Sequence, residues 1–346
     1  MKVLAIRTKY RHHSEYAGYD NICTYISDCI IEGINEKGNI PNKLYLKYKW
    51  LYEFKSYYNY HKNIDLVHIL YGEEYFRFST YLFKQPIICT FHQPAEILER
   101  ELRYGDTAGR LYKYTHQITK RRFQDLDAAI VLEESQKKVL SKFVPIEKIH
   151  VIPHGIDAQS LINKNANRLI DSKKILTVGN WLRDWDFYYQ LLSKFEQIDP
   201  SVKFVLVNRN IDKAILDRLL NKLNFIYAEN ISDESLIELI QTSSLLFMPL
   251  KGAAANNALL ECISLGCPVL MPDIVNYPHA YSEIIRYYEF DSIESAIIQI
   301  QYFINMQFID RSRLKEIAQK ISLSFSWENI AKKTIEVYHK VLMKND

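Results

Sequence analysis

Short apolar runs of strand length recur along the whole chain, and longer amphipathic segments separate them. The runs are apolar throughout and do not alternate with polar residues, as expected of strands that are covered on both faces. They occupy residues 2–6, 65–70, 86–91, 128–132, 148–153, 174–178, 203–207, 245–250 and 268–272. Strands and helices that alternate in this way predict an α/β fold with doubly wound parallel sheets.

The segments between these runs carry the spacing of amphipathic helices. Residues 21–34 (NICTYISDCIIEGI) and 232–243 (SDESLIELIQTS) are two examples. In the second, the serine or the aspartate at the start can cap the first turn, and Leu236, Ile237 and Ile240 form an apolar stripe. We therefore expect helices at both places.

The predicted strands are too many for one sheet of ordinary width, which indicates two domains. A chain of 346 residues is long enough for two cores. The Asn- and Lys-rich stretch 158–174 is the natural break. We place the domains at residues 1–160 and 161–325, followed by a last helix at 326–346.

Composition narrows the class of protein. Apolar residues make up 48% of the chain and charged residues 25%, as in soluble globular proteins. The formal net charge of +3 does not call for a nucleic-acid or membrane partner. The five cysteines include no CxxC pair and are expected to be small buried side chains in a reducing compartment. No window is apolar enough for a spanning helix and no signal peptide is recognisable, so we expect a cytoplasmic protein.

The stretch ANNALLECISLGCPVL (255–270) combines small residues, two asparagines and one carboxylate. It follows a predicted strand, at the edge where parallel sheets bind ligands. Asn256 or Asn257 can cap a helix whose first amides have no partner inside the helix, and Ala255 allows a ligand to come close. The helix dipole favours an anion there by about 0.3–1 kcal/mol. We predict a phosphate-binding helix start, with a glycine and a proline ending the helix.

The carboxylate of this stretch, Glu261, lies four residues after Asn257 and therefore on the same face of the helix. One turn from a phosphate site, it is well placed to accept hydrogen bonds from two vicinal hydroxyls, as on a ribose. The alternative is an ordinary capped helix with Glu261 on a solvated face. The spacing alone does not decide between them.

These residues resemble the nucleotide-sugar motif of GT-B glycosyltransferases, in particular glycosyltransferase family 4. Three further stretches resemble that family in the same order: KIHVIPHGID (148–157) its interdomain signature, KILTVGNWLRDWD (174–186) its phosphate-binding strand and loop, and FSWENIAKKTIEVYHKVL (325–342) its crossover helix. The resemblance implies two Rossmann-like domains facing a cleft, the first for the acceptor and the second for the nucleotide sugar. The last helix would cross back to the first domain.

The chain departs from the family pattern at several positions. The family often has a glutamate eight residues before the one that matches Glu261, and this chain has Ala253 there. Asn180 replaces the arginine after "VG", and Trp185 replaces a later lysine. Arg183 is the nearest cation, and we expect it to contact the diphosphate, because its planar fork suits phosphate oxygens. The alternative is an arginine that pairs with a neighbouring aspartate in a surface loop.

The loop after the first predicted strand, RTKYRHHSEYAGYDN (7–21), lies where the family has a glycine-rich loop near the donor phosphates. Gly18 matches that loop loosely. Asp20 is a candidate general base for an acceptor hydroxyl, which an inverting enzyme requires, or else the cap of the helix predicted for 21–34. His13 is a candidate for the acceptor side.

Two other predicted strands end in polar residues. His92 follows the strand 86–91 and resembles the family histidine that contacts the donor sugar. Glu73 and Glu74 follow the strand 65–70 and are candidates for the base or for an acceptor contact. Polar residues just past the ends of parallel strands face the ligand.

Lysines interleave with aromatic residues at 44–63, and residues 118–123 add a basic cluster. Such a face suits anionic lipid headgroups. A solvated surface with snorkelling lysines is the alternative. The scattered lysines give little support to a nucleic-acid partner.

We therefore expect a glycosyltransferase that takes a UDP- or GDP-type nucleotide sugar and a glycan, lipid-linked or small-molecule acceptor, in cell-surface glycan, polysaccharide or glycolipid synthesis. Retention at the anomeric carbon is expected over inversion, without a cofactor. No metal is expected either, on the ground that neither an Asp-x-Asp motif nor clustered His or Cys ligands are recognised. The alternatives are a non-catalytic nucleotide-sugar-binding subunit and a sugar-nucleotide 2-epimerase. The expected location is the cytoplasm or the inner face of the membrane.

Overall fold

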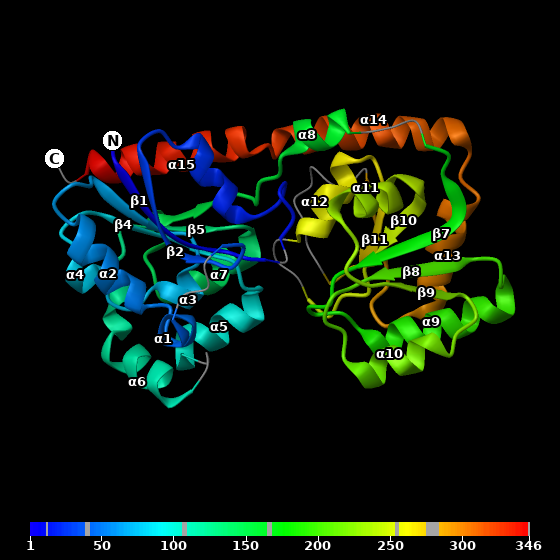
Figure 1. Cartoon of the computed structure of the whole chain (residues 1–346), viewed down its shortest axis with the longest axis horizontal. Helices are drawn as coiled ribbons and strands as arrows, with labels where there is room; N and C mark the ends of the chain where they lie inside the picture. The colour runs from blue at the N-terminus through cyan, green and yellow to red at the C-terminus, as the bar shows by residue number, and fades with distance from the viewer. Residues whose placement is uncertain are drawn as a thin grey trace. The chain divides into compact units, whose positions relative to one another are not determined.

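A computed structural model describes residues 1–11, 13–38, 42–105, 109–164, 168–252, 256–274 and 284–344. The chain divides into two compact units. Unit 1 consists of Met1–Gly155 and Phe325–Asp346, and unit 2 of Ile156–Ser324. Each unit contains one six-stranded sheet in which all neighbouring strands are parallel, with helices packed around it (Figure 1). The predicted pair of parallel α/β sheets is confirmed.

The sheet of unit 1 has the strand order β2-β1-β3-β4-β5-β6. Its strands are β1 (Val3–Lys9), β2 (Cys29–Asn35), β3 (Leu66–Ile69), β4 (Ile87–Phe91), β5 (Ala128–Val131) and β6 (Ile149–Val151). Its helices are the 3-10 helix η1 (Tyr19–Tyr25), α1 (Lys43–Lys47), α2 (Leu51–Tyr60), α3 (Gly72–Tyr75), α4 (Ser79–Leu82), α5 (Ala95–Tyr104), α6 (Arg110–Ile118), the 3-10 helix η2 (Lys120–Phe123), α7 (Glu134–Leu140), the 3-10 helix η3 (Ile146–Lys148) and α15 (Trp327–Leu342).

The sheet of unit 2 has the strand order β12-β11-β10-β7-β8-β9. Its strands are β7 (Asp171–Val178), β8 (Lys203–Val207), β9 (Phe225–Ala228), β10 (Ser243–Phe247), β11 (Val269–Pro272) and β12 (Ile285–Tyr288). Its helices are α8 (Ala158–Asn163), α9 (Trp185–Ile198), α10 (Lys213–Leu220), α11 (Asp233–Thr242), α12 (Asn257–Ser264), α13 (Ile293–Ile304) and α14 (Phe308–Ser324). Helices α9 and α13 bury an aromatic-rich core against the sheet, whereas α12 packs with α8 and α14.

The helix predicted for residues 21–34 is wrong. The short 3-10 helix η1 ends at Tyr25, Asp28 adopts a left-handed φ of 57°, and the edge strand β2 follows. Gly33 in β2 has a φ of 118°, and a Cβ there would lie 2.0 Å from the carbonyl oxygen of Arg7. Only glycine fits such a position. Asp20 does not cap a helix over 21–34, because no such helix exists.

The C-terminal helix α15 belongs to unit 1 and is fixed by buried polar contacts. The Tyr338 hydroxyl lies 2.6 Å from Nδ1 of His68 on β3, and the indole Nε1 of Trp327 donates to the carbonyl of Tyr16 at 3.0 Å. Gly155 lies against the indole of Trp327, where a Cβ would come within 2.3 Å of a ring carbon. The indole therefore occupies the space that a side chain at position 155 would need.

The cysteines and the helices agree with two expectations from the sequence, buried thiols and the lack of a membrane-spanning segment in the described residues. All five cysteines are free, and four of them are buried, as expected. Among the described helices, none combines the length and the hydropathy that crossing a membrane requires. The stretch 158–174, expected to be a polar break, instead contains α8 and the beginning of β7.

Candidate functional site

In unit 2 the chain changes direction across the sheet between β7 and β10. From β7 it continues to β8 and β9 on one side, and from β10 to β11 and β12 on the other. The loops after β7 and β10 therefore diverge at the carboxyl edge, where open α/β sheets bind ligands. Both loops that the sequence singled out in this half of the chain begin there.

Helix α12 starts after this point, as predicted. Asn256 is its cap, and its side-chain oxygen accepts a hydrogen bond from the amide of Leu259 at 3.3 Å. Asn257 is the first helical residue. Gly266 has a φ of 79° and follows the last turn, so the predicted helix end is also confirmed. Ala255 lies outside the described residues.

Glu261 is buried in the second turn of α12, with 6% of its surface exposed. The alternative in which it lies on a solvated face is therefore wrong. A carboxylate out of solvent is costly unless it is paired or hydrogen-bonded. Glu261 lies one turn behind the capped helix start, and its contact with a ribose stays a prediction.

The loop after β7 holds the other two predicted phosphate contacts. Arg183 is 7% exposed, and its guanidinium donates to the carbonyls of Val178 at 2.7 Å and Trp181 at 3.1 Å. Asn180 is exposed, and its amide donates to the carbonyl of Asn210 at 2.8 Å. Arg183 is thus a buried residue in a loop whose residue Asn180 is exposed.

The expected absence of an Asp-x-Asp motif is wrong, because residues 125–127 and 184–186 are two such stretches. In the first, one carboxylate accepts from a β4 amide and the other pairs with an arginine. In the second, one caps α9 and the other pairs with an arginine. Within the described ranges, no group of three or more His, Cys, Asp or Glu side chains could hold a metal ion.

Unit 1 has its own change of direction, between β1 and β3. The chain leaves β1 for the edge strand β2 and returns through β3 to β4, β5 and β6. The loops after β1 and β3 therefore diverge at the carboxyl edge of this sheet. All predicted site residues of the N-terminal half follow β1, β3 or β4.

Gly18, Asp20 and His13 converge in the loop after β1. A Cβ at Gly18 would lie 2.7 Å from Oδ1 of Asp20 and 3.6 Å from Nδ1 of His13. Asp20 is 8% exposed, and its Oδ2 lies 3.9 Å from the guanidinium of Arg7. Burial raises the pKa of Asp20, and the charge of Arg7 opposes that shift. The structure therefore brings these three candidates together around a charged pair.

His92 directly follows β4 and lies among aromatic rings. Its ring stacks on Tyr71 at a centroid distance of 4.7 Å and meets the edge of Tyr19 at 4.6 Å. Burial lowers the pKa of His92 to about 3, so the imidazole is neutral at pH 7. Nε2 lies 2.7 Å from the carbonyl of Leu70, and since a carbonyl only accepts, Nε2 carries the proton. Nδ1 is therefore a hydrogen-bond acceptor.

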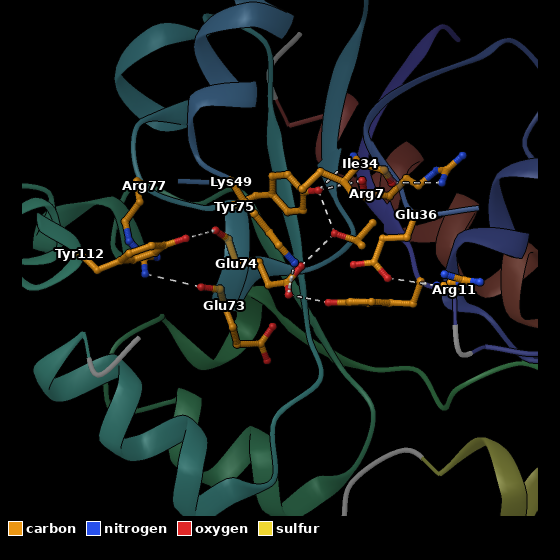
Figure 2. A network of polar contacts seen from close by, with 12 residues as sticks. Arg7, Arg11, Ile34, Glu36, Lys49, Glu73, Glu74, Tyr75, Arg77 and Tyr112 are labelled. Atoms are coloured by element: carbon orange, nitrogen blue, oxygen red, sulfur yellow. Dashed lines mark hydrogen bonds and ion pairs between the residues drawn. The ribbon is translucent and has the colours of Figure 1, made fainter. Parts of the chain in front are cut away.

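The side chains of Glu73 and Glu74 point in different directions (Figure 2). Glu73 is buried, and its carboxylate accepts from the amide of His92 at 2.5 Å and that of Gln93 at 2.7 Å. It thus fixes the backbone that carries His92. Glu74 accepts from three donors on other elements, Thr8 at 3.0 Å, Tyr10 at 2.5 Å and Lys49 at 2.6 Å.

Sequence reasoning missed a third carboxylate, Glu53 on α2. It is fully buried and accepts from the amides of Arg77, Phe78 and Ser79 at 2.8–3.1 Å, and also from the Ser79 hydroxyl. It thereby satisfies the amides at the start of α4. No local motif marks it, because the segment 44–63 suggested only a basic surface.

Two buried carboxylates make the stability of unit 1 depend on pH. Burial raises the pKa of Glu53 to about 7 and that of Glu73 to about 8, from an ordinary 4.5. Between the ordinary pKa of 4.5 and these raised pKa values, the two carboxyl groups bind more protons in the folded state than in the unfolded chain. Their contribution to stability therefore falls as the pH rises through this interval. His68, His92 and His154 have the opposite shift, to about 3, and cost stability only below about pH 6.5.

His116 and His150 have the same direction of pKa shift as the other three histidines. We therefore expect the free energy of unfolding to be greatest near neutral pH and to be lower at pH 8 than at pH 7. Urea unfolding at both pH values measures this difference. A free energy that is unchanged or higher at pH 8 would contradict the burial of these carboxyl groups.

Comparison with known proteins shows a likeness to glycosyltransferases in part of the sequence and in the fold. Residues 11–160 match the family model of Glycosyltransferase Family 4. The structure is similar to a glycosyltransferase from Rickettsia africae ESF-5, with a TM-score of 0.66 and 14% identity over 99% of this chain and 98% of that one. It is also similar to HepE of Anabaena, solved with UDP and glucose, with a TM-score of 0.67 and 13% identity over 98% and 100%.

TarM is a larger relative in fold, with a TM-score of 0.61 and 13% identity over 79% of this chain. The chain spans only 54% of the length of TarM. No curated protein sequence matches the chain. The comparisons confirm the GT-B fold and the resemblance to glycosyltransferase family 4.

Proposed function

We propose that this chain, with its GT-B fold and its match to Glycosyltransferase Family 4, transfers a sugar from a nucleoside-diphosphate sugar to an acceptor hydroxyl. One observation carries the proposal. Helix α12 begins, capped by Asn256, beyond the point where β7 and β10 diverge, and Glu261 is buried one turn behind its start. Helix-start amides suit a diphosphate, and a carboxylate at that distance suits ribose hydroxyls.

In this proposal unit 2 binds the donor nucleotide and unit 1 binds the acceptor. In unit 2, Glu261 holds the ribose of a UDP- or GDP-type donor, while Asn256 and Asn257 hold the diphosphate. Asn180 and Arg183, in the loop after β7, are the polar candidates for the surroundings of the diphosphate. Gly18 in unit 1 stays a separate prediction from the sequence. Charge develops on the leaving diphosphate, so fixed amides and cations supply the electrostatic part of catalysis without a metal.

The acceptor is proposed to be a glycan, lipid-linked or small-molecule hydroxyl compound. In unit 1, His13, Glu73 and Glu74 are the acceptor-side groups. Lys43 and Lys47 on α1 are exposed, and so are Lys120 and Arg121 on η2. These cations would suit an anionic membrane surface that carries a lipid-linked acceptor.

Release of the nucleoside diphosphate by the purified protein alone tests the function. UDP-glucose, UDP-N-acetylglucosamine and GDP-mannose would each be offered with sugar, glycan and polyprenyl-phosphate sugar acceptors, in the presence of EDTA. We expect transfer from one donor. Binding without transfer would favour the non-catalytic subunit, for which Ala253 in place of the usual glutamate is the supporting feature. Reversible epimerisation without an acceptor would identify an epimerase.

His92 is proposed to accept a hydrogen bond from a hydroxyl of the donor sugar through Nδ1. Replacement by alanine removes that acceptor, and we expect kcat/KM to fall about tenfold to a hundredfold while the Kd for the nucleoside diphosphate stays the same. Replacement of the exposed His339 by alanine is the matched control. A parallel loss of nucleotide affinity would contradict the assignment to the sugar.

We propose retention of the anomeric configuration, and the Asp20→Asn variant tests it. The carboxylate of Asp20 is paired with Arg7 and lies close to Gly18, which is the arrangement of a structural residue and not of a general base. We therefore expect the Asp20→Asn variant to keep turnover within about tenfold of wild type. Initial rates and NMR of the product anomer measure both quantities. A general base contributes about 10²–10⁴-fold, so a loss of that size with an inverted product would instead establish Asp20 as the base.

A further inference from the structure

The two loops at the change of direction in unit 2 are joined through their backbones. The amide of Asp184 donates to the carbonyl of Pro249 at 2.6 Å, and the amide of Lys251 donates to the carbonyl of Leu182 at 2.9 Å. Arg183 and Leu250 form an isolated antiparallel bridge between them. Residues 182–184 of the loop after β7 and residues 249–251 after β10 are therefore held together.

This pairing sends neighbouring side chains to opposite sides. Arg183 and Leu250 both turn inward, with 7% and 1% of their surfaces exposed. The guanidinium of Arg183 is occupied with the carbonyls at the end of β7. A group that braces its own loop in this way is poorly available to a ligand in the solvent.

Lys251 turns outward from the same bridge. Its side chain is 54% exposed, and its Nζ lies 3.5 Å from Oδ2 of Asp184. Oδ1 of Asp184 accepts from the amide of Phe187 and caps α9, so this carboxylate is fixed. An ion pair as exposed as this one contributes little, and the ammonium keeps donors for a further anion.

We propose that Lys251, and not Arg183, supplies the positive charge that binds the diphosphate at the start of α12. The inference rests on the proposed function and names the cation of the same site. Lysine is a common phosphate ligand that acts as a point charge on a flexible stem. Lys251 precedes the α12 cap Asn256 in the same loop.

The test is calorimetric titration of UDP and of uridine into the full chain and into the Lys251→Gln and Lys194→Gln variants. Lys194 is an exposed residue of α9 and serves as the matched control. We expect Lys251→Gln to weaken UDP binding about tenfold or more and to leave uridine binding unchanged. Its UDP affinity should also depend less on salt. Lys194→Gln should bind UDP as wild type does.

Three results would overturn the inference. One is wild-type UDP affinity in Lys251→Gln, and another is an equal loss for uridine and UDP. The third is a loss of UDP affinity in Arg183→Lys at an unchanged melting temperature, because a brace should affect stability first. If the wild-type chain binds neither UDP nor GDP, ADP or CDP, the proposed donor site itself fails, and the role of Lys251 fails with it.

Discussion

Replacing Trp327 by alanine should lower the free energy of unfolding of unit 1 by about 3–5 kcal/mol. The indole is 1% exposed, donates to the carbonyl of Tyr16, and fills the space over Gly155. Its removal leaves a cavity and an unpaired buried carbonyl, and it releases the first turn of α15. Calorimetric or urea unfolding measures the loss, which corresponds to a melting temperature lower by on the order of ten degrees.

Tyr58 provides the control for this experiment, because 84% of its surface is exposed on α2. Its replacement by alanine should change the free energy of unfolding by less than about 0.5 kcal/mol. A Trp327→Ala variant as stable as the Tyr58→Ala variant would contradict the assignment of α15 to unit 1.

The second large effect is expected at Glu261. Its replacement by alanine should weaken binding of the donor nucleotide by roughly 1–3 kcal/mol, the cost of losing hydrogen bonds from ribose hydroxyls to a charged acceptor. Glu261→Gln keeps the shape of this buried side chain and should lose part of that affinity. Titration of UDP into each variant measures the differences, with the exposed Glu238→Gln as the control.

The ribose assignment has a sharper test in the ligand. Wild-type protein should bind 2′,3′-dideoxy-UDP more weakly than UDP, and the Glu261 variants should bind both equally. If the variants still distinguish the two nucleotides, Glu261 does not contact the ribose hydroxyls.

Strands buried on both faces were predictable, whereas three of the four edge strands, β2, β9 and β12, were not. All nine predicted runs are strands, because a continuous apolar run fits a strand covered on two sides. The edge strand β2 pairs with β1 alone, and its residues, taken together with residues 21–28, fit the spacing of an amphipathic helix. Its left-handed Asp28 and Gly33 decide the outcome, and their φ values depend on contacts with β1.

The candidate site divides in the same way. The start of α12 follows from local chemistry, since an asparagine cap and a glycine end are properties of a few adjacent residues. The direction of Arg183 follows from a backbone bridge to Leu250, far away in the sequence. Glu53 is bound to amides of the α3–α4 connection for the same kind of reason. Contacts between residues far apart in the sequence cannot be predicted from the local pattern of either segment.

The most direct test of the central claim is thermal unfolding of the chain with UDP, GDP, ADP and CMP, alone and as common sugar conjugates. A ligand at a hundred times its Kd adds about 2.7 kcal/mol, typically a shift of several degrees. We expect one nucleoside diphosphate to raise the melting temperature, and we expect Glu261→Ala to abolish the shift. If none of the nucleotides changes the melting temperature of the wild-type protein, the donor site in unit 2 is contradicted.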